Sequence, residues 1–475
     1  MTSSSRDAAP LPERRLSMLD CASMTIGIII GSGIYEAPSI VAAQPGGAGV
    51  LVGTWLAGGL FALVGAWCYA ELATRFPQQG GDYVYLSQAF GRSVGLLFAW
   101  TQLWVIRPGS IGAMACVFAA YALALQAELF PGTRPDSIPF LFYACGSVGV
   151  LSLVNVAGVP LGKSMQNFLT AAKVLGLALV VVAGFAGAPE IAPPIVADAA
   201  RADAGPTFDG LTTAMIFVLF AYSGWNEIGC VTAEIRDPRR NLGRSLLLAA
   251  GVVTTIYVGV NLACLNVLGL DGMARSSAVA GDAVTRVWGR PGSVLVSLLI
   301  CVSALGSTNG MIFTGARIYY ALGHRHAVFA PLGWWSRRFG TPWLSLVVQG
   351  VVTSALVVGF SRSGSAEAGR YDFQRLVMFM TPPFYVFLAL SAAAVVWFRL
   401  RGRGAADAYR SPLFPLPPLL MAAGSVFLAV QGVKYAWGQW NADKSLWWPA
   451  AWVGGTLASG LAAAAWERMS VDDDA

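Results

Sequence analysis

Glycine-rich runs that include polar residues interrupt two apolar segments of this 475-residue chain. The first run covers residues 26–35 (IGIIIGSGIY), where two glycines flank Ser32, and the second covers residues 220–229 (FAYSGWNEIG). Glycine costs about 1 kcal/mol in a helix interior relative to alanine, and unwound backbone at membrane depth is tolerated only where it lines a cavity or is buried in protein. A close helix–helix contact is the alternative, because Gly27 and Gly31 have the spacing of a small-xxx-small motif.

An opened helix presents unpaired peptide groups on both sides of its break. The N–H groups of residues 31–33, at the positive end of a helix dipole, suit a carboxylate. The carbonyls of Ile29, Phe220 and Ala221 suit an ammonium group. A ligand that carries both groups on one carbon is an α-amino acid, so the two runs together predict an amino-acid site.

Three charged residues also fall inside apolar segments. A charge near the middle of a bilayer normally faces an interior cavity with a partner, and Lys173 lies too deep in its segment for snorkelling to the interface. Glu36 and Glu227 each lie at one of the two glycine-rich runs. A buried carboxylate must pair, protonate or meet a cationic ligand. Three interpretations are therefore open for both residues. The first is a pocket for a cationic or polar side chain, and the second is proton coupling. The third is a structural role, as an ion pair with Arg107 or Arg317 or as a group exposed to a watery vestibule.

The composition indicates that lipid is the solvent for much of the chain. It is 56% apolar and 12% charged, with a mean hydropathy of +0.61, whereas soluble domains carry about 25% charged residues. A span needs about 20 mostly apolar residues, and about twelve such segments are expected. They lie near residues 19–43, 50–73, 93–125, 138–157, 167–187, 210–235, 245–268, 291–322, 342–360, 376–398, 413–436 and 446–466. The glycine-rich runs then fall in spans one and six, and paired interruptions in two halves of a chain point to a transporter binding site.

The basic residues predict the orientation. More Lys and Arg fall in the loops on the side of the N-terminus than on the other side, so both termini are expected in the cytoplasm of a multi-pass inner-membrane protein. The net charge of +6 follows from these loops, and nucleic acid is not expected as a partner. Residues 1–15 have no signal-peptide pattern, so insertion is expected to depend on the helices themselves.

Several other classes of function find no support in the sequence. There is no phosphate-binding loop, HExxH motif or nucleophile–base pair, so neither an enzyme nor an ATP-driven pump is predicted. The seven cysteines all lie in apolar segments without a C-x-x-C pair, and His324 and His326 lie in a basic loop. No catalytic residue, metal site or cofactor is therefore expected.

An ordered set of motifs accompanies these features. The motifs are Gly31-Ser-Gly-Ile34, Tyr69-Ala-Glu-Leu72, Pro77-Gln-Gln-Gly-Gly-Asp-Tyr83, Ile106-Arg-Pro-Gly-Ser110, Leu169-Thr-Ala-Ala-Lys173, Phe220-Ala-Tyr-Ser-Gly-Trp-Asn226, Glu234-Ile-Arg-Asp-Pro-Arg-Arg-Asn-Leu242 and Gly306-Ser-Thr-Asn-Gly310. With them the chain resembles the amino acid–polyamine–organocation (APC) superfamily, most closely its L-type amino-acid transporter branch.

The resemblance implies an all-α membrane protein with two inverted five-helix repeats, broken helices one and six, and two extra helices. It divides the chain into a cytoplasmic tail (1–16), a core (17–400, with repeats 17–187 and 210–400), helices eleven and twelve (411–467) and a second tail (468–475). It also implies alternating access around a central amino-acid site, with an inner gate shaped by Glu71, Gly80 and Gly81. A capped helix end and turn is the structural alternative for that loop.

The resemblance further implies which residues bind the substrate. Ser32, Gly33 and their neighbours would bind the carboxylate, and Ser223 departs from the glycine common at its position. From their position at the second break, Trp225 and Tyr222 are also candidates for an aromatic gate over the ligand. The expected substrate-binding residues are Ile29, Gly31, Ser32, Gly33, Ile34, Phe220, Ala221, Ser223, Trp225, Asn226 and Glu227.

Sodium-independent members of the family carry a lysine at the position of Lys173. Its ammonium would stand where related carriers bind sodium, next to Ser307 or Thr308, so no sodium coupling is expected. The leading prediction is an exchanger or uniporter of amino acids. A proton-coupled carrier of cationic amino acids or polyamines and a non-transporting amino-acid sensor are the alternatives. The loop 126–137 has no cysteine, so a disulfide-linked heavy subunit is not expected.

Overall fold

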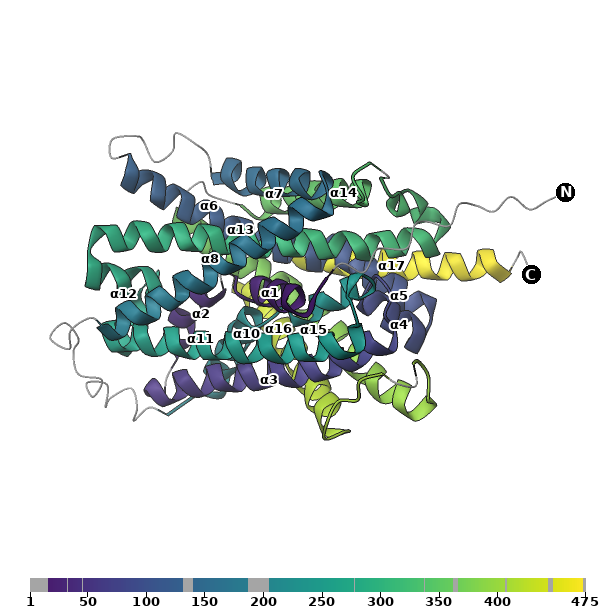
Figure 1. Cartoon of the computed structure of the whole chain (residues 1–475), viewed down its shortest axis with the longest axis horizontal. Coiled ribbons are helices and arrows are strands. Elements are labelled where there is room, and N and C mark those ends of the chain that lie inside the picture. The colour runs from purple at the N-terminus through teal and green to yellow at the C-terminus, as the bar shows by residue number, and fades with distance from the viewer. Residues whose placement is uncertain are drawn as a thin grey trace.

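The structure is a computed structural model, and it consists of long helices that run mostly along one axis (Figure 1). It describes residues 16–31, 33–44, 46–130, 140–186, 205–276, 278–336, 338–361, 366–405, 408–442 and 447–472. The helices of the first half are α1 (Met18–Ile29), α2 (Gly33–Ala42), α3 (Gly47–Arg75), α4 (Asp82–Phe90), α5 (Arg92–Thr101), η1 (Gln102–Ile106), α6 (Arg107–Leu129), α7 (Phe140–Val156) and α8 (Val159–Ala186). Those of the second half are α10 (Phe208–Ala221), η3 (Trp225–Glu234), α11 (Pro238–Arg275), α12 (Val279–Trp288), α13 (Arg290–Arg325), η4 (Ala327–Gly333), α14 (Trp343–Phe360), α15 (Ala366–Arg401), α16 (Leu416–Ala442) and α17 (Trp447–Asp472).

The predicted all-α membrane fold is confirmed. The described residues contain nine helical segments that are long and apolar enough to span a membrane, or ten if the bent pair α1 and α2 is one span. α7 and α17 occupy the places of the spans expected near residues 138–157 and 446–466. α7 is apolar but shorter than the nine spanning segments. α17 continues to Asp472, into the segment expected to be a tail from residue 468. Most of the N-terminal tail expected at residues 1–16 lies outside the described residues.

α13 packs against α1, α6, α7 and α8. Glycines allow these close approaches: a Cβ on Gly306 of α13 would lie 2.6 Å from Cε of Lys173 on α8. On the outside of the bundle, leucine, valine and phenylalanine side chains are exposed, as on Leu153, Leu175 and Val351. Apolar residues therefore cover both the core and the outer surface, which fits burial in lipid.

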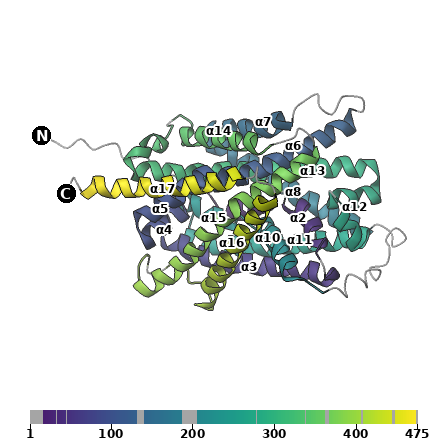
Figure 2. The same cartoon turned by 180° about the vertical axis from the view of Figure 1, so that it is seen from behind.

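α15 and α16 pack against each other and cross one face of the bundle obliquely (Figure 2). α15 also packs against α6, and α16 against α3. α4 and α12 lie at opposite ends of the molecule (Figure 1). The interior between α1, α2, α6, α10, α13 and α15 is where the two glycine-rich runs lie.

Candidate functional site

The first break lies between α1 and α2. α1 ends at Ile29, Ile30 leaves the helix with φ −71° and ψ 85°, and α2 begins at Gly33. The axes of the two helices differ by 46°. Ser32, the residue expected to contact a carboxylate, lies outside the described residues. The helix is thus opened within the first glycine-rich run.

Lys173 and Ser307, from two other helices, contact carbonyls freed at the end of α1. The ammonium of Lys173, on α8, donates to the carbonyl oxygens of Gly27 at 2.6 Å and Ile30 at 2.8 Å. The hydroxyl of Ser307, on α13, lies 3.2 Å from the Lys173 ammonium and within 3.3 Å of the carbonyls of Gly27, Ile28 and Ile30. Lys173 is fully buried. Its charge is therefore surrounded by backbone dipoles and a hydroxyl. Thr308, the other residue expected beside Lys173, is also buried, but it does not line the cavity described below.

The second break lies between α10 and η3. α10 ends at Ala221, and the chain turns at Gly224, which has a φ of +114°. The 3₁₀-helix η3 then begins at Trp225. The amide and the hydroxyl of Ser223 both donate to the carbonyl of Phe220, at 3.0 and 2.6 Å. This break is therefore closed by hydrogen bonds within its own turn. Only glycine adopts the φ of Gly224 without strain.

The two breaks touch each other. A Cβ on Gly33 would lie 2.7 Å from Cα of Ala221, and a Cβ on Gly224 would lie 2.8 Å from Cγ2 of Ile28. Both distances are too short for a real Cβ, so glycine is required for the approach at these positions. The two glycine-rich runs thus face each other inside the protein rather than facing lipid.

A cavity lies between the breaks. It holds about 740 Å³ of empty space, including space open to solvent. Of the residues expected to bind substrate, those in its described lining are Ile29, Gly31, Gly33, Phe220, Ala221, Ser223, Asn226 and Glu227, and Ser307 is also there. Ile34 and Trp225 are not among them; the Trp225 ring packs on Tyr69 with centroids 5.1 Å apart. The remaining lining residues include Gln102, Arg107, Ser110, Met114, Met311, Met380 and Phe384.

Glu227 forms an ion pair inside this cavity. Its Oε2 accepts from Nη1 of Arg107 at 2.8 Å and from the Thr314 hydroxyl. Arg107 follows directly after the π-helix η1, and single-turn π-helices inside α-helices often occur at functional sites. Arg317 pairs instead with Glu234, at 2.8 Å. Of the interpretations considered for Glu227, the structure thus contains the ion pair with Arg107.

Glu36 lies on α2, just beyond the first break. It is buried, with 4% of its surface exposed, and it is not part of the described cavity lining. Exposure to a watery vestibule therefore does not describe its surroundings in this conformation. The interpretations of Glu36 as a side-chain or proton site stay predictions.

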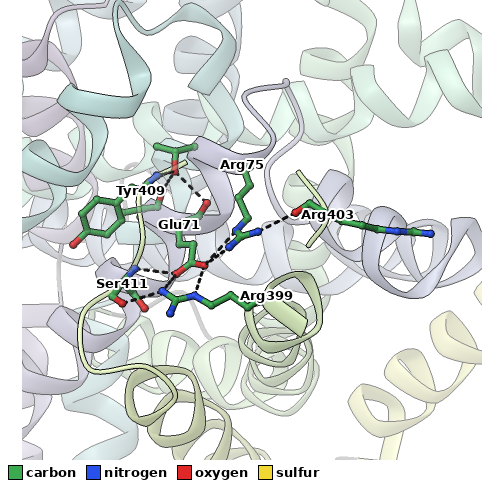
Figure 3. Close-up of polar contacts among 8 residues, drawn as sticks. Glu71, Arg75, Arg399, Arg403, Tyr409 and Ser411 are labelled. Carbon is green, nitrogen blue, oxygen red and sulfur yellow. Dashed lines mark hydrogen bonds and ion pairs between the residues drawn. The ribbon is translucent and has the colours of Figure 1, made fainter. Parts of the chain in front are cut away.

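Glu71, expected at an inner gate, is the centre of a buried ion cluster at the end of α3 (Figure 3). Its carboxylate accepts from Arg75 at 2.9 Å, from two nitrogens of Arg399 at 2.8 and 2.6 Å, and from the amide of Ser411 at 2.9 Å. Tyr409 donates its amide to the neighbouring Thr74 hydroxyl at 3.0 Å. The cluster ties α3 to the end of α15 and to the segment that follows it.

Gly80 and Gly81, the other residues expected at the gate, both have positive φ, of 112° and 51°. A Cβ on Gly81 would lie 2.9 Å from Sγ of Cys230, so the loop before α4 packs directly on η3. Asp82 begins α4 and accepts from the hydroxyls of Tyr69 and Ser391. Burial raises the pKa of Asp82 to about 6, although these hydroxyls and the Asn226 amide oppose that shift.

Two residues of the site were not expected from the sequence. Tyr257, on α11, places its hydroxyl 2.9 Å from the carbonyl of Ile29 and 3.0 Å from that of Ala221, so one hydroxyl bridges both breaks. Ser303, on α13, lies 3.2 Å from the carbonyls of Ile30 and Gly31. A tyrosine or serine in an apolar helix is ordinary by itself. The spacing of Ser303 and Ser307, four residues apart on one helix face, is the one pattern that could have found Ser303.

Two facing broken helices, a buried lysine on the carbonyls of the first and a cavity between them define a membrane transporter of the broken-helix type. The family model described as "Amino acid permease" matches residues 16–457. The chain therefore belongs to the amino acid permease family of the APC superfamily, as the motifs predicted, and it is a transporter rather than an enzyme.

Three similar proteins align with between 67% and 88% of this chain. The b(0,+)-type amino acid transporter 1 of Homo sapiens is 28% identical over 428 residues, which cover 88% of this chain and 82% of that protein. The serine/threonine exchanger SteT of Bacillus subtilis is 29% identical over 423 residues, covering 88% and 90%. The large neutral amino acids transporter small subunit 2 of Oryctolagus cuniculus is 31% identical over 326 residues, covering 67% and 60%.

Proposed function

We propose that this protein is a sodium-independent exchanger of neutral amino acids that works by alternating access across the cell membrane. The single observation that carries the proposal is Lys173, whose ammonium donates to the carbonyls of Gly27 and Ile30 at the first break. A sodium ion coordinated by the same carbonyls would meet a fixed positive charge. Transport by this chain then needs no sodium gradient.

The proposal assigns the amino and carboxylate groups of the substrate to the two breaks. The N–H groups after Gly31 would bind the carboxylate, and the carbonyls near Phe220 and Ala221 would bind the ammonium. The names of two similar proteins support the proposal: a serine/threonine exchanger supports exchange, and a large neutral amino acids transporter supports neutral substrates. The excess of basic residues in the loops on the side of the N-terminus supports cytoplasmic termini.

The alternative of a carrier for cationic amino acids has less support. It rests on the buried carboxylates of Glu36 and Glu227, and the Arg107–Glu227 ion pair at 2.8 Å compensates the charge of Glu227. A second cation beside Arg107 would be repelled by its guanidinium. The inverted repeats 17–187 and 210–400 remain part of the proposal, because they give the two broken helices equivalent places.

Proteoliposomes test the proposal. Vesicles loaded with unlabelled neutral amino acid should take up labelled amino acid at the same rate in sodium and in choline buffer, without a pH gradient. Empty vesicles should take up much less. Uptake that requires sodium, or that needs an imposed proton gradient and no internal substrate, would contradict it.

A further inference from the structure

The two oxygens of the Glu227 carboxylate have different surroundings. Oε2 accepts from Arg107 Nη1 at 2.8 Å and from the Thr314 hydroxyl. Among the residues that the structure describes, no group donates to Oε1. Glu227 lines the cavity between the two breaks. One oxygen is thus fixed, and the other is an acceptor available to whatever occupies the cavity.

The charge on this acceptor is compensated. Arg107 is 3% exposed and Glu227 8% exposed, so water screens their pair weakly. The pair is electrically neutral as a unit, and it is rigid because Thr314 and Arg107 hold the same oxygen. A cationic side chain that approached Oε1 would also approach the Arg107 guanidinium, and an anionic one would be repelled by the carboxylate. The neutral pair therefore gives neither charged class the net attraction that an unpaired carboxylate or an unpaired guanidinium would give.

The neighbouring walls are mostly apolar. Met114, Met311, Met380 and Phe384 line the same cavity. An apolar wall accepts an aliphatic side chain and an isosteric hydroxylated one about equally, whereas a fixed acceptor left without its donor penalises the aliphatic one. The single acceptor at Oε1 thus decides between side chains of equal size.

We infer that Glu227, held by Arg107 and Thr314, is a specificity-determining residue that selects neutral amino acids whose side chain donates a hydrogen bond: hydroxyl, thiol or primary amide. The inference rests on the proposed exchange function and adds the class of side chain. Glu227 accepts the side-chain donor through Oε1, while the breaks hold the amino and carboxylate groups.

Threonine and valine form the sharpest test, because they differ by one hydroxyl in place of a methyl group. Exchange kinetics in proteoliposomes should give a KM for threonine at least about tenfold below that for valine. The KM for serine should likewise lie below that for alanine, and lysine should exchange poorly. This measurement on the unaltered protein needs no variant.

Two variants locate the selectivity. Glu227→Gln keeps the shape and removes the charge, and we expect the threonine preference to fall severalfold, because charge-assisted hydrogen bonds are about twice as strong as neutral ones. The double variant Arg107→Leu with Glu227→Leu removes the pair together and should abolish the preference. Glu234→Gln is the matched control: Glu234 is also buried and paired on η3, with Arg317, but does not line the cavity, so its threonine-to-valine ratio should stay that of the wild type.

Equal KM values for threonine and valine in the wild type, or an unaltered ratio in active Glu227→Gln protein, would overturn this inference alone. A wild-type protein that exchanges no amino acid would overturn the proposed function and this inference with it. The two failures are thus distinguishable in one set of vesicles.

Discussion

The two breaks of the transporter core are built differently, although both open a helix near the same cavity. At the first break, side chains from three other helices reach the freed carbonyls: Lys173 from α8, Tyr257 from α11, and Ser303 and Ser307 from α13. At the second break, the turn bonds to itself through Ser223, and the bridging Tyr257 hydroxyl is the one long-range donor that the described residues supply to its carbonyls.

This difference suggests a division of roles. The first break is bound to the α8–α13 scaffold, so its geometry is set before the substrate arrives. The second break depends on its own turn and on a hydroxyl that has one proton for two carbonyls. An incoming ammonium can supply the missing donor, so in this account substrate binding orders the second break and leaves the first unchanged.

The largest effect is expected from Lys173→Ala. It removes a charged donor from two buried carbonyls, and hydrogen bonds to charged groups contribute about 1.5–3 kcal/mol each. We expect the initial exchange rate to fall by about 100-fold while the protein still inserts and purifies. Lys434→Ala, on an exposed position of α16, is the control and should match the wild type. Exchange by Lys173→Ala within threefold of the wild type would remove the basis for a fixed first break.

The second-largest effect on exchange is expected from Gly224→Ala. Its φ of +114° strains any other residue, and the new Cβ would lie 2.8 Å from Cγ2 of Ile28, so the two breaks would be pushed apart. Strain of about 1–3 kcal/mol corresponds to a loss of exchange of roughly tenfold or more. Gly251→Ala, on an open face of α11, supplies the control. Wild-type exchange by Gly224→Ala would mean that the breaks need not touch.

Tyr257→Phe removes the hydroxyl shared by both breaks. A neutral hydrogen bond contributes about 1 kcal/mol, so we expect about a fivefold reduction in exchange and a lower melting temperature of the purified protein. Because the second break has no other long-range donor among the described residues, the KM should change more than in Ser303→Ala. Equal KM changes in the two variants would contradict the proposed difference between the breaks.

Two serine variants compare the breaks directly. Ser307→Ala removes a hydroxyl that lies against three carbonyls of the first break, and we expect exchange to fall about fivefold. Ser223→Ala removes a hydroxyl whose acceptor, the Phe220 carbonyl, still accepts from the Ser223 amide, so exchange should stay within about twofold. The exchange rates of the two variants would be measured side by side at matched protein density. A larger loss of exchange in Ser223→Ala than in Ser307→Ala would contradict the proposed difference between the breaks.

The smallest effect on exchange is expected from Asp82→Asn, which keeps an acceptor for Tyr69 and Ser391. Its readout is pH. The pKa of Asp82 is raised from 3.8 to about 6, so its contribution to stability is fully present below pH 3.8 and is lost as pH rises through 6. Between pH 5 and 7.5 the wild type should lose about 1 kcal/mol that Asp82→Asn does not lose. Parallel melting-temperature curves for the two proteins over this range would refute the assignment.

Much of the site could be predicted from the sequence, because helix breaks and buried charges have local signals. Glycines at residues 27, 31 and 33 and a lysine within an apolar segment mark the first break and its partner without any coordinates. The side chains that complete the site could not be found in this way. Tyr257 reaches the two breaks, and Met380 the cavity, only because α11 and α15 pack beside them, and an aromatic or methionine residue in an apolar helix is ordinary.

Side-chain direction was the other unpredictable feature. Ser307 and Thr308 are neighbours in sequence, but successive residues point about 100° apart on a helix, and Ser307 is the one bonded to Lys173. Trp225 adjoins the second break, yet its ring lies on Tyr69 against Gly65. Adjacency in sequence to a functional element therefore did not predict contact with the cavity.

Binding of substrate analogues tests most directly whether the two breaks hold the amino and carboxylate groups of an amino acid. Purified protein would be titrated with the amino acid that it exchanges fastest, with the methyl ester of that amino acid, and with its N-acetyl derivative. We expect each analogue to bind at least about tenfold more weakly, since each loses a charged group that a break would bind. An analogue that binds as tightly as the free amino acid would contradict it.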